Sequence, residues 1–372
     1  MRNILTKPAK IKTPKEVEKQ FNFLRIILAV GIALGIAMII ILLISDDPLG
    51  AIYSFVVGPL TTKRRMGNVI EIMTPLIFTG VGVCFIFSAN QTNMAVEGGF
   101  LLGALGATVI ATTLQLPPVL HPLFSMLLGG IFGMLACAVP AGLYVKFGSK
   151  PVVSSIMVNW TSLYIALGVI NHILRDPSAG FLSSYKIAKT AELPGILKGT
   201  NIHAGIIIAA IVVVFGYLYL YKSKFGYEIR TVGKNPEFAA YSGIPVNGVI
   251  MKAQLIGGFL AGLGGAVELL GMYSRFQYQG QTGHGFNGIL VGIIAGYNPK
   301  LVPFAALFLA YVQVGADVMQ RSSDIPIELV NIIQAIIIML VVAERFLHKT
   351  KHKQLVKAAN AQLEMKGAAV NE

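Results

Sequence analysis

Acidic side chains inside long apolar runs are the first candidates for chemistry in this sequence. Glu97, Glu268 and Asp317 each stand in such a run. An ionisable side chain inside a bilayer costs about 3 kcal/mol, so the ones that occur face a cavity or a polar partner. Glu97 either contributes to a polar pocket or holds a broken helix together by accepting backbone N–H bonds. Glu268 and Asp317 are equally consistent with polar contacts between helices.

Two polar groups offer what a ring-shaped substrate requires. Asn93 and Glu97 are four residues apart, so they share one face of a predicted helix. Asn159 directly precedes Trp160, and an aromatic ring beside an amide provides a stacking face with a donor and an acceptor, as a nucleobase or a sugar ring needs. The alternative is that Asn159 packs helices together and Trp160 marks the membrane interface.

A third polar group stands at the start of a short apolar run and includes His284. No second His, Cys or acid lies at ligand spacing from His284, so a polar helix cap is favoured and no metal site is expected. Cys84 and Cys137 lie in apolar runs and are predicted to be buried hydrophobic residues. The candidate substrate-pathway residues are Asn93, Glu97, Asn159, Trp160, His284, Phe286 and Asn287.

Motifs of covalent or ATP-dependent chemistry are missing from the sequence. It contains no His-Glu-x-x-His, no Gly-x-Ser-x-Gly and no Gly-x-x-x-x-Gly-Lys-Ser/Thr. The nearest phrase, Thr231-Val-Gly-Lys-Asn235, has Glu228 where the first glycine of a P-loop would stand. We therefore expect no catalytic residues and no cofactor, and a membrane-embedded enzyme is disfavoured because no nucleophile is paired with a base.

The composition is that of an integral membrane protein. Apolar residues make up 55% of the 372 residues and charged residues only 13%, against about a quarter in soluble domains. The mean hydropathy is +0.70. The 30 Lys and Arg against 17 Asp and Glu predict positive cytoplasmic loops rather than nucleic-acid binding.

The apolar runs predict an all-α polytopic protein with ten transmembrane helices. A basic arm (1–20) precedes a transmembrane domain (21–345), which includes a polar segment (222–248), and a basic tail (346–372) follows. The predicted spans are residues 21–44, 69–88, 94–114, 122–145, 152–173, 202–221, 249–272, 286–297, 301–320 and 326–345.

Ten crossings place both termini on one side of the membrane. Most Lys and Arg residues then fall in the basic arm, the basic tail and the connections on the same side, so the positive-inside rule makes both termini cytoplasmic. Lys63, Arg64 and Arg65 disagree, because they fall on the external side. Either this segment lies along the membrane surface or the predicted start of the second span is wrong.

Two short similarities suggest an internal repeat. Gly99-Phe-Leu-Leu-Gly103 resembles Gly288-Ile-Leu-Val-Gly292, and Pro118-Val-Leu-His-Pro122 resembles Pro299-Lys-Leu-Val-Pro303. The glycine stretches belong to the third and eighth predicted spans, which run in opposite directions. An inverted repeat of the kind found in many transporters would follow. The alternative is that Gly-x-x-x-Gly is simply common in membrane helices.

The polar segment at 222–248 is too hydrophilic to span a membrane and is patterned like a short helix. Asn235 reads as its N-cap, Pro236 as its first turn and Gly243 as its stop, which predicts a cytoplasmic helix at 236–242.

This segment resembles the cytoplasmic loop of ABC-importer permeases related to the ribose and branched-chain amino-acid systems. The matching phrases are Phe225-Gly226, Arg230, Val232-Gly233, Asn235-Pro236, Ala239-Ala240 and Gly243-Ile244. In that family the loop is a coupling helix that docks on the ATPase subunit. The resemblance implies coupling roles for Arg230, Gly233, Asn235, Pro236, Glu237, Ala239, Ala240 and Gly243.

Two further phrases resemble the nucleoside and simple-sugar branch of this family. Asn93-Met-Ala-Val-Glu97-Gly98 is similar to its Asn-Ile-Gly-x-Glu-Gly phrase, and Ser155-Ile-Met-Val-Asn159-Trp160 to its Ile-Met-Leu-Asn-Trp phrase. Ala95 and Gly99 depart from the usual Gly and Gln. The resemblance runs from about residue 71 to residue 343.

By this resemblance the chain is a multi-pass permease of a bacterial plasma membrane. The implied partners are ABC ATPase subunits that bind the ATP, a second and different permease chain, and an extracellular substrate-binding lipoprotein. The implied substrates are nucleosides, especially purine nucleosides. A simple-sugar importer and an ion-coupled secondary transporter, with Glu97 or Asp317 as proton carrier, are the alternatives.

Overall fold

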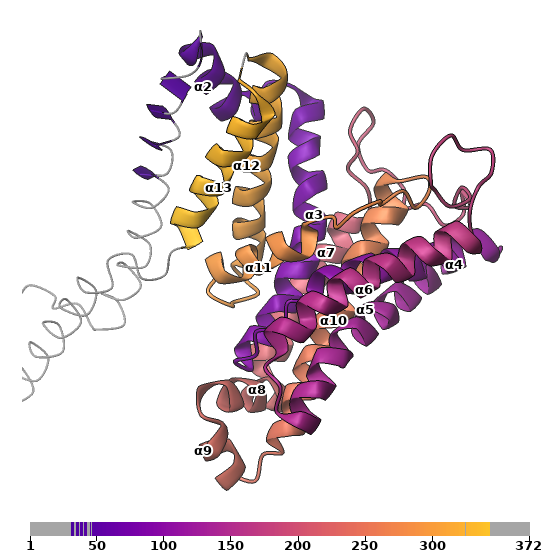
Figure 1. The fold of residues 1–372 in the computed structure, drawn as a ribbon, viewed down its shortest axis with the longest axis vertical. Helices are drawn as coiled ribbons and strands as arrows, with labels where there is room; N and C mark the ends of the chain where they lie inside the picture. The colour runs from indigo at the N-terminus through magenta and orange to yellow at the C-terminus, as the bar shows by residue number, and fades with distance from the viewer. Residues whose placement is uncertain are drawn as a thin grey trace, which may run out of the picture. The chain divides into compact units, whose positions relative to one another are not determined.

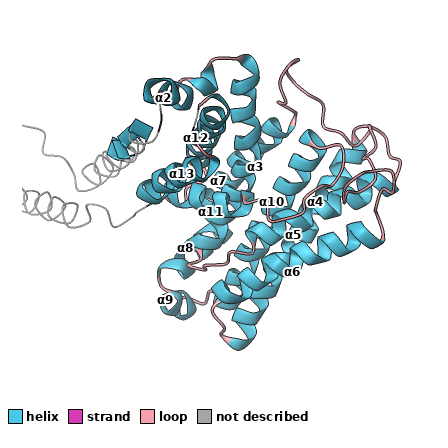
Figure 2. Cartoon of the chain, turned by 45° about the horizontal axis from the view of Figure 1, so that its top comes forward, coloured by secondary structure: helices cyan, strands magenta, loops and turns pink. Residues whose placement is uncertain are grey.

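The computed structural model describes residues 47–323 and 325–342, together with short pieces between residues 31 and 45. The described part is helical, contains no β-strand and divides into two compact units (Figures 1 and 2). One unit comprises residues 53–322. The other joins residues 1–52 to residues 323–372, and its described elements are α13 (Ile327–Val342) and the beginning of α2 (Pro48–Val56).

Seven helices of the larger unit are long and apolar enough to cross a membrane, and α11 is a shorter apolar helix. The all-α polytopic fold is thereby confirmed. Most of the first predicted span and residues 343–345 of the last lie outside the described residues. The elements after α2 are η1 (Gly58–Leu60), α3 (Lys63–Ser88), α4 (Val96–Thr113), α5 (Leu120–Phe147), α6 (Pro151–His172), α7 (Gly205–Lys222), α8 (Lys224–Lys234), α9 (Pro236–Tyr241), α10 (Val246–Met272), α11 (His284–Ile294) and α12 (Val302–Ser322).

The start of α3 corrects the predicted second span. The helix begins at Lys63 rather than at residue 69, because Thr62 caps it by accepting a hydrogen bond from the Arg65 N–H at 3.2 Å. The Arg65 guanidinium also bonds the Thr61 hydroxyl at 2.7 Å. The three basic residues therefore form the first turn of α3, which begins six residues before the predicted span.

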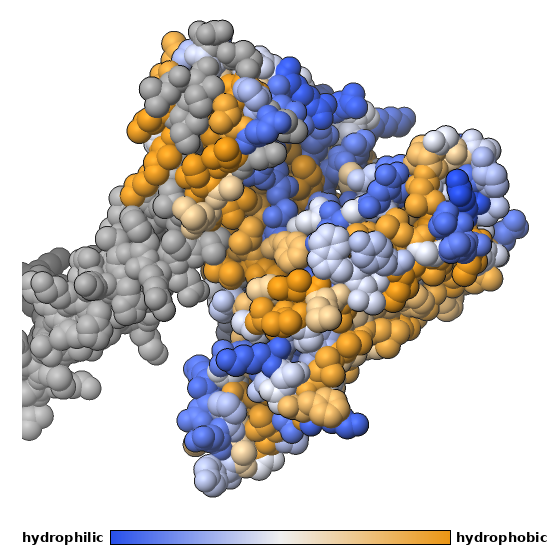
Figure 3. Space-filling model, in the orientation of Figure 1, coloured by the Kyte–Doolittle hydropathy of each residue, from blue (hydrophilic) through white to orange (hydrophobic). Residues whose placement is uncertain are grey.

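Different segments of the chain form the two ends of the larger unit. The connection between α6 and α7 lies at one end, and α8 and α9 lie at the other (Figures 1 and 2). In the connection, Asp176 pairs with Arg275 at 3.3 Å. Hydrogen bonds from Ser178, assisted by the charge of Arg275, hold the pKa of the Asp176 carboxyl below its ordinary value. Figure 3 shows apolar residues along the long helices and hydrophilic residues towards both ends.

The helix packing is reciprocal between the two halves of this unit. The long helix α10 packs against α4 and α5, whereas α3 packs against α11 and α12. The helices α3 and α10 thus each pack against two helices of the other half, an arrangement that an internal repeat would produce, and the inverted orientation of that repeat stays a prediction. The helices approach closely at glycines: a Cβ added to Gly103 would lie 2.4 Å from the Cα of Gly262. Small residues permit such backbone contact between membrane helices.

Candidate functional site

The start of α4 is held by two buried amide side chains, Asn159 from α6 and Asn93 from the connection before α4. The expectation that Asn93 and Glu97 share a helix face was wrong, because α4 begins only at Val96. Asn159 of α6 accepts a hydrogen bond from the Gly98 N–H at 2.8 Å and donates one to the Met94 carbonyl at 3.0 Å. Asn93 donates to Gln254 of α10 at 2.6 Å and to the Cys137 carbonyl of α5 at 3.2 Å. The amides of Asn93 and Asn159 therefore fix this start of a helix to three other helices.

Glu97 joins the N-termini of α4 and α11. One oxygen of its fully buried carboxylate accepts from the Gly283 N–H at 2.8 Å and from the Thr282 hydroxyl at 3.0 Å, and the other accepts from the Gly285 N–H at 2.7 Å. An anion is favourable at a helix N-terminus because the unpaired N–H groups point towards it. These contacts agree with the interpretation in which Glu97 holds helix ends together by accepting backbone N–H bonds.

Gly285 makes this junction possible. A Cβ added at residue 285 would lie 2.3 Å from the Cα of Glu97, which is far inside contact distance. Only glycine therefore allows the first turn of α11 to approach the backbone of α4 so closely.

His284 begins α11 and reaches α10 instead of only capping its own helix. Its Nε2 lies 3.3 Å from a carboxylate oxygen of Glu268, which also accepts a hydrogen bond from the Tyr278 hydroxyl at 3.3 Å. The His284 ring lies 5.2 Å from the ring of Phe100 on α4. Glu268 is thus an interhelical polar contact, one of the interpretations that the sequence left open.

The remaining candidates on α11 are partly buried. Phe286 packs against the hydrophobic core that includes Ile289, and Asn287 is also half-buried. Within the described ranges no three His, Cys, Asp or Glu side chains form a group that could hold a metal ion.

Sequence reasoning missed the buried Glu71 of α3, although an acid in an apolar run was the available signal.

Trp160 lies apart from the other pathway candidates. Its neighbour Asn159 is buried, whereas Trp160 is 50% exposed, because successive residues of a helix point about 100° apart. The ring stacks on Tyr164, one turn later, with centroids 6.4 Å apart. Tyr164 was not anticipated, and its spacing of four residues from Trp160 was the signal that could have found it.

Asp317 does not make the interhelical contact that was one expectation for it. Its side chain is 46% exposed and pairs with Arg321 of the same helix at 3.0 Å. An i, i+4 pair on one helix explains this acid without any buried proton carrier.

The predicted short helix in the polar segment exists as α9. Asn235 caps it by accepting from the Phe238 N–H at 2.9 Å, and Gly243 follows it with a φ of 77°. Ala239 is fully buried, whereas Phe238 is 57% and Tyr241 93% exposed. The helix is therefore anchored by one face and presents two aromatic rings on its exposed side.

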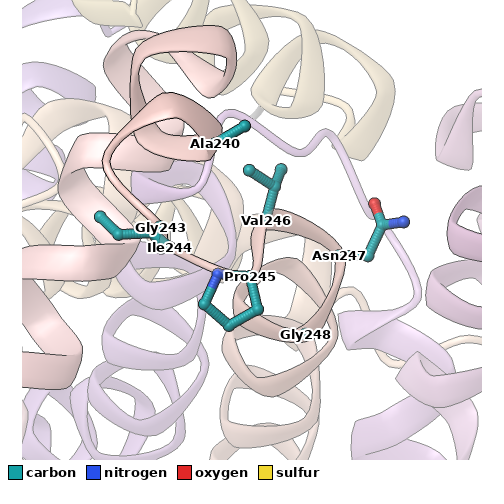
Figure 4. Close-up of a pocket in the computed structure, with 7 residues that line it drawn as sticks. All are labelled: Ala240, Gly243, Ile244, Pro245, Val246, Asn247 and Gly248. Carbon is teal, nitrogen blue, oxygen red and sulfur yellow. The ribbon is translucent and has the colours of Figure 1, made fainter.

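A shallow depression lies beside α9. It has a volume of about 430 Å³ and is bordered by Ala240 and by the residues that lead into α10 (Figure 4). Ala240 on its border is exposed, and Glu237 is exposed on the same helix α9. The lining contains no charged and no aromatic side chain.

Arg230 and Gly233 lie on α8, a helix that the sequence did not predict. The Arg230 guanidinium covers the ring of Tyr221 at 4.9 Å. A Cβ added to Gly233 would lie 2.0 Å from the Ser88 carbonyl at the end of α3. Both residues therefore connect α8 and α9 to the membrane helices, and neither belongs to the exposed face of α9.

Comparison with known proteins defines the class of this protein. Residues 65–342 match the family described as "Branched-chain amino acid transport system / permease component", and the chain belongs to this family of ABC-importer permeases. It is thus a membrane-embedded transport component.

Several curated relatives share most of its length. The chain is 31% identical over 336 residues to the guanosine ABC transporter permease protein NupP of Bacillus subtilis (strain 168), covering 89% of this chain and 97% of the relative. It is 29% identical over 334 residues to the glucose ABC transporter permease protein TsgB13 of Haloferax volcanii, covering 86% and 87%. It is 28% identical over 345 residues to the nucleoside ABC transporter permease protein NupB of Lactococcus lactis subsp. cremoris, covering 89% and 93%.

Proposed function

We propose that this permease forms the path for nucleoside uptake, purine nucleosides first, and that a separate ATPase subunit drives it. The observation that carries the coupling part is α9: a capped, exposed helix whose buried Ala239 anchors it while Phe238 and Tyr241 face outward. The similarity to guanosine and nucleoside permeases supports the substrate. A simple-sugar substrate is the second candidate because a glucose permease is about equally similar.

In the proposed orientation α8 and α9 lie in the cytoplasm of a bacterial cell, as do both termini. Lys222, Lys224 and Lys234 belong to the end of the unit that carries these helices, which agrees with the positive-inside rule. The connection between α6 and α7 then lies outside the cell, where a substrate-binding lipoprotein would deliver its cargo.

Force from the ATPase would enter through α9 and reach the membrane helices through α8. Aromatic side chains are typical energetic centres of protein interfaces, so Phe238 and Tyr241 are the expected contacts with a groove of the ATPase. Because Gly233 packs closely against Ser88, a displacement of α8 would move α3 directly. This chain needs no nucleotide site of its own in such a mechanism.

The second permease chain, related but different, is assigned to the exposed face of α6. Only 33% of the apolar 18-residue stretch of α6 is buried within this chain. Trp160 and Tyr164 lie near the middle of this helix, away from the headgroup level where such rings usually sit in lipid. The Tyr164 hydroxyl would be costly in hydrocarbon, so this face is better placed against protein or a hydrated path.

A nucleobase passing between the two permeases would stack on the Trp160 ring, which is exposed and lies at 27° to the ring of Tyr164. The other candidates, Asn93, Glu97, Asn159 and His284, would then act by holding α4 and α11 in place. Phe286 and Asn287 stay candidates for a contact made in another state of the transport cycle.

Uptake measurements on the complete importer test this proposal. Proteoliposomes that contain this chain, the partner permease and the ATPase are supplied with binding protein and either labelled guanosine or labelled glucose. We expect ATP-dependent guanosine uptake that persists when the membrane potential is collapsed. Glucose uptake without guanosine uptake would assign a simple sugar as the substrate instead of a nucleoside. Uptake driven by an ion gradient without ATP would refute the mechanism.

A further inference from the structure

An apolar groove runs along the outside of α7 and α10. It has a volume of about 500 Å³, and its walls come from these two helices with Met134 of α5 at one side. Only 28% of α7 is buried in this chain, so the groove opens towards the surroundings of the helices. Along α7 it is lined by Ile211, Phe215 and Tyr219, and along α10 by Leu255, Phe259 and Leu263.

The length of the groove is close to the thickness of one bilayer leaflet. Its lining residues extend over nine positions on each helix, from 211 to 219 and from 255 to 263, and the eight intervals between them correspond to about 12 Å at the helical rise. Half of the hydrocarbon core of a bilayer is about 15 Å. Because α7 ends at Lys222, the groove occupies the half of α7 that is nearer to α8 and α9.

Positive charge stands at the end of the groove that adjoins α8. Lys252 precedes Leu255 by one turn of α10, is exposed and lies with its Nζ 5.4 Å from the Phe225 ring. Lys222 follows Tyr219 by one turn of α7. Tyr219, Phe225 and Lys252 also border a small adjoining depression, together with one acid, Glu228. Lys222, Lys224 and Lys252 outweigh that single acid.

We propose that this groove is a binding site for an anionic phospholipid of the leaflet that adjoins α8 and α9, the cytoplasmic leaflet in the proposed orientation. One acyl chain lies between Phe215 and Phe259, and the phosphate of the headgroup is bound by Lys222 and Lys252. The apolar lining of the groove matches an acyl chain, and the cationic side chains at its end match an anionic headgroup. A bound lipid would support α7, which has few contacts inside the chain and carries α8.

Lipid binding by the purified full-length chain tests this site independently of transport. The delipidated protein in neutral detergent is titrated with phosphatidylglycerol and, separately, with phosphatidylcholine of the same acyl chains, and the adducts are counted by native mass spectrometry. We expect a preference for phosphatidylglycerol. The double variant Lys222→Gln/Lys252→Gln should weaken phosphatidylglycerol binding about 25-fold, about fivefold for each lysine.

Two pairs of variants separate the headgroup from the acyl chain. Lys146→Gln/Lys150→Gln removes two charges at the end of α5 and should leave the preference unchanged. Ile211→Trp fills the groove and should weaken both lipids, whereas Ile207→Trp, on an exposed position of the same helix outside the groove, should weaken neither.

Equal binding of the two lipids by the unmodified chain would overturn the proposal. So would an equal loss in the control variants, or an unchanged affinity in Ile211→Trp. Crosslinking of the partner permease into this groove in the assembled importer would assign it to protein instead. None of these outcomes bears on nucleoside uptake, so a failure here is distinct from a failure of the proposed function.

Discussion

The junction of α4 and α11 and the exposed surfaces of α6 and α9 use polar and aromatic residues in opposite ways. At the junction, Asn93, Glu97 and Asn159 are buried, each is hydrogen-bonded to backbone groups, and Asn93 is also bonded to Gln254 of α10. On the surfaces, Trp160 and Tyr241 are exposed and contact little of this chain. The buried polar residues therefore stabilise the fold, and the exposed aromatic residues are the ones that we propose for contacts with substrates and partners.

The largest expected effect comes from removing the carboxylate at the junction. Glu97→Ala leaves the Gly283 and Gly285 N–H groups and the Thr282 hydroxyl without an acceptor in a buried position. Each lost bond to a charged group costs about 1.5 to 3 kcal/mol, so the chain should be destabilised by more than about 4 kcal/mol.

Thermal unfolding of the purified protein, together with its yield in the membrane, measures this effect. Glu97→Gln serves as the milder variant because its amide retains one acceptor oxygen. A stable Glu97→Ala protein that fails only in transport would show that Glu97 serves the substrate rather than the fold.

A second, smaller effect concerns close packing at the same junction. Gly285→Ala adds a methyl group where the Glu97 backbone already stands, which should destabilise the chain by about 1 to 3 kcal/mol. Gly168→Ala on α6 is the matched control, because nothing lies within 4 Å of its added Cβ. Its melting temperature should be unchanged or slightly higher. Equal losses in the two variants would contradict the account of the junction.

On α9 the expected effect is on coupling and not on folding. Tyr241→Ala removes a ring that is 93% exposed in this chain, so the melting temperature should not change. If the Tyr241 ring contributes about 2 kcal/mol to the binding free energy, its removal should lower the affinity for the ATPase about 30-fold. Tyr227, also exposed but on α8, provides the control, and its Tyr227→Ala variant should bind the ATPase normally.

Ala240→Trp should obstruct docking at the depression beside α9, and normal uptake by this variant would exclude docking there.

The smallest effect is expected on α6. Trp160→Ala and Tyr164→Ala should each lower nucleoside uptake about fivefold to tenfold, since a stacking contact is worth about 1 kcal/mol, while assembly with the partner permease is kept. Size-exclusion chromatography of the importer monitors assembly. If either variant dissociates the two permeases, the ring packs between chains instead of contacting substrate. Asn159→Ala, by contrast, should lower the melting temperature.

The elements that the sequence predicts well are those with local signals. The helix α9 follows from an Asn cap, a Pro in the first turn and a Gly after the end, and all three act within a few residues. The long apolar spans follow from composition. The helix α8 was missed although local signals for it exist. Ser223 caps it by accepting a hydrogen bond from the Gly226 N–H at 3.1 Å, and its buried residues Gly226, Ile229 and Val232 recur at helical spacing. The segment was judged by its polarity, which excludes a membrane span but not an amphipathic helix.

The arrangement of the site depends on distant contacts, so the sequence could only propose it. Asn159 and Trp160 are neighbours in the chain, but a helix turns about 100° per residue, and one faces the interior while the other faces outward. The tie between Glu97 and Gly285 joins residues that are 188 positions apart. In contrast, the pairing of Asp317 with Arg321 follows from i, i+4 spacing and was available from the sequence.

Guanosine accumulation in proteoliposomes tests the central claim most directly, because the claim is that a separate ATPase drives this permease through α9. The complete importer should accumulate guanosine only with ATP and with the ATPase subunits present, and Tyr241→Ala should abolish most of that uptake while the assembly of the two permeases persists. Uphill accumulation by this chain in the absence of the ATPase would contradict the account.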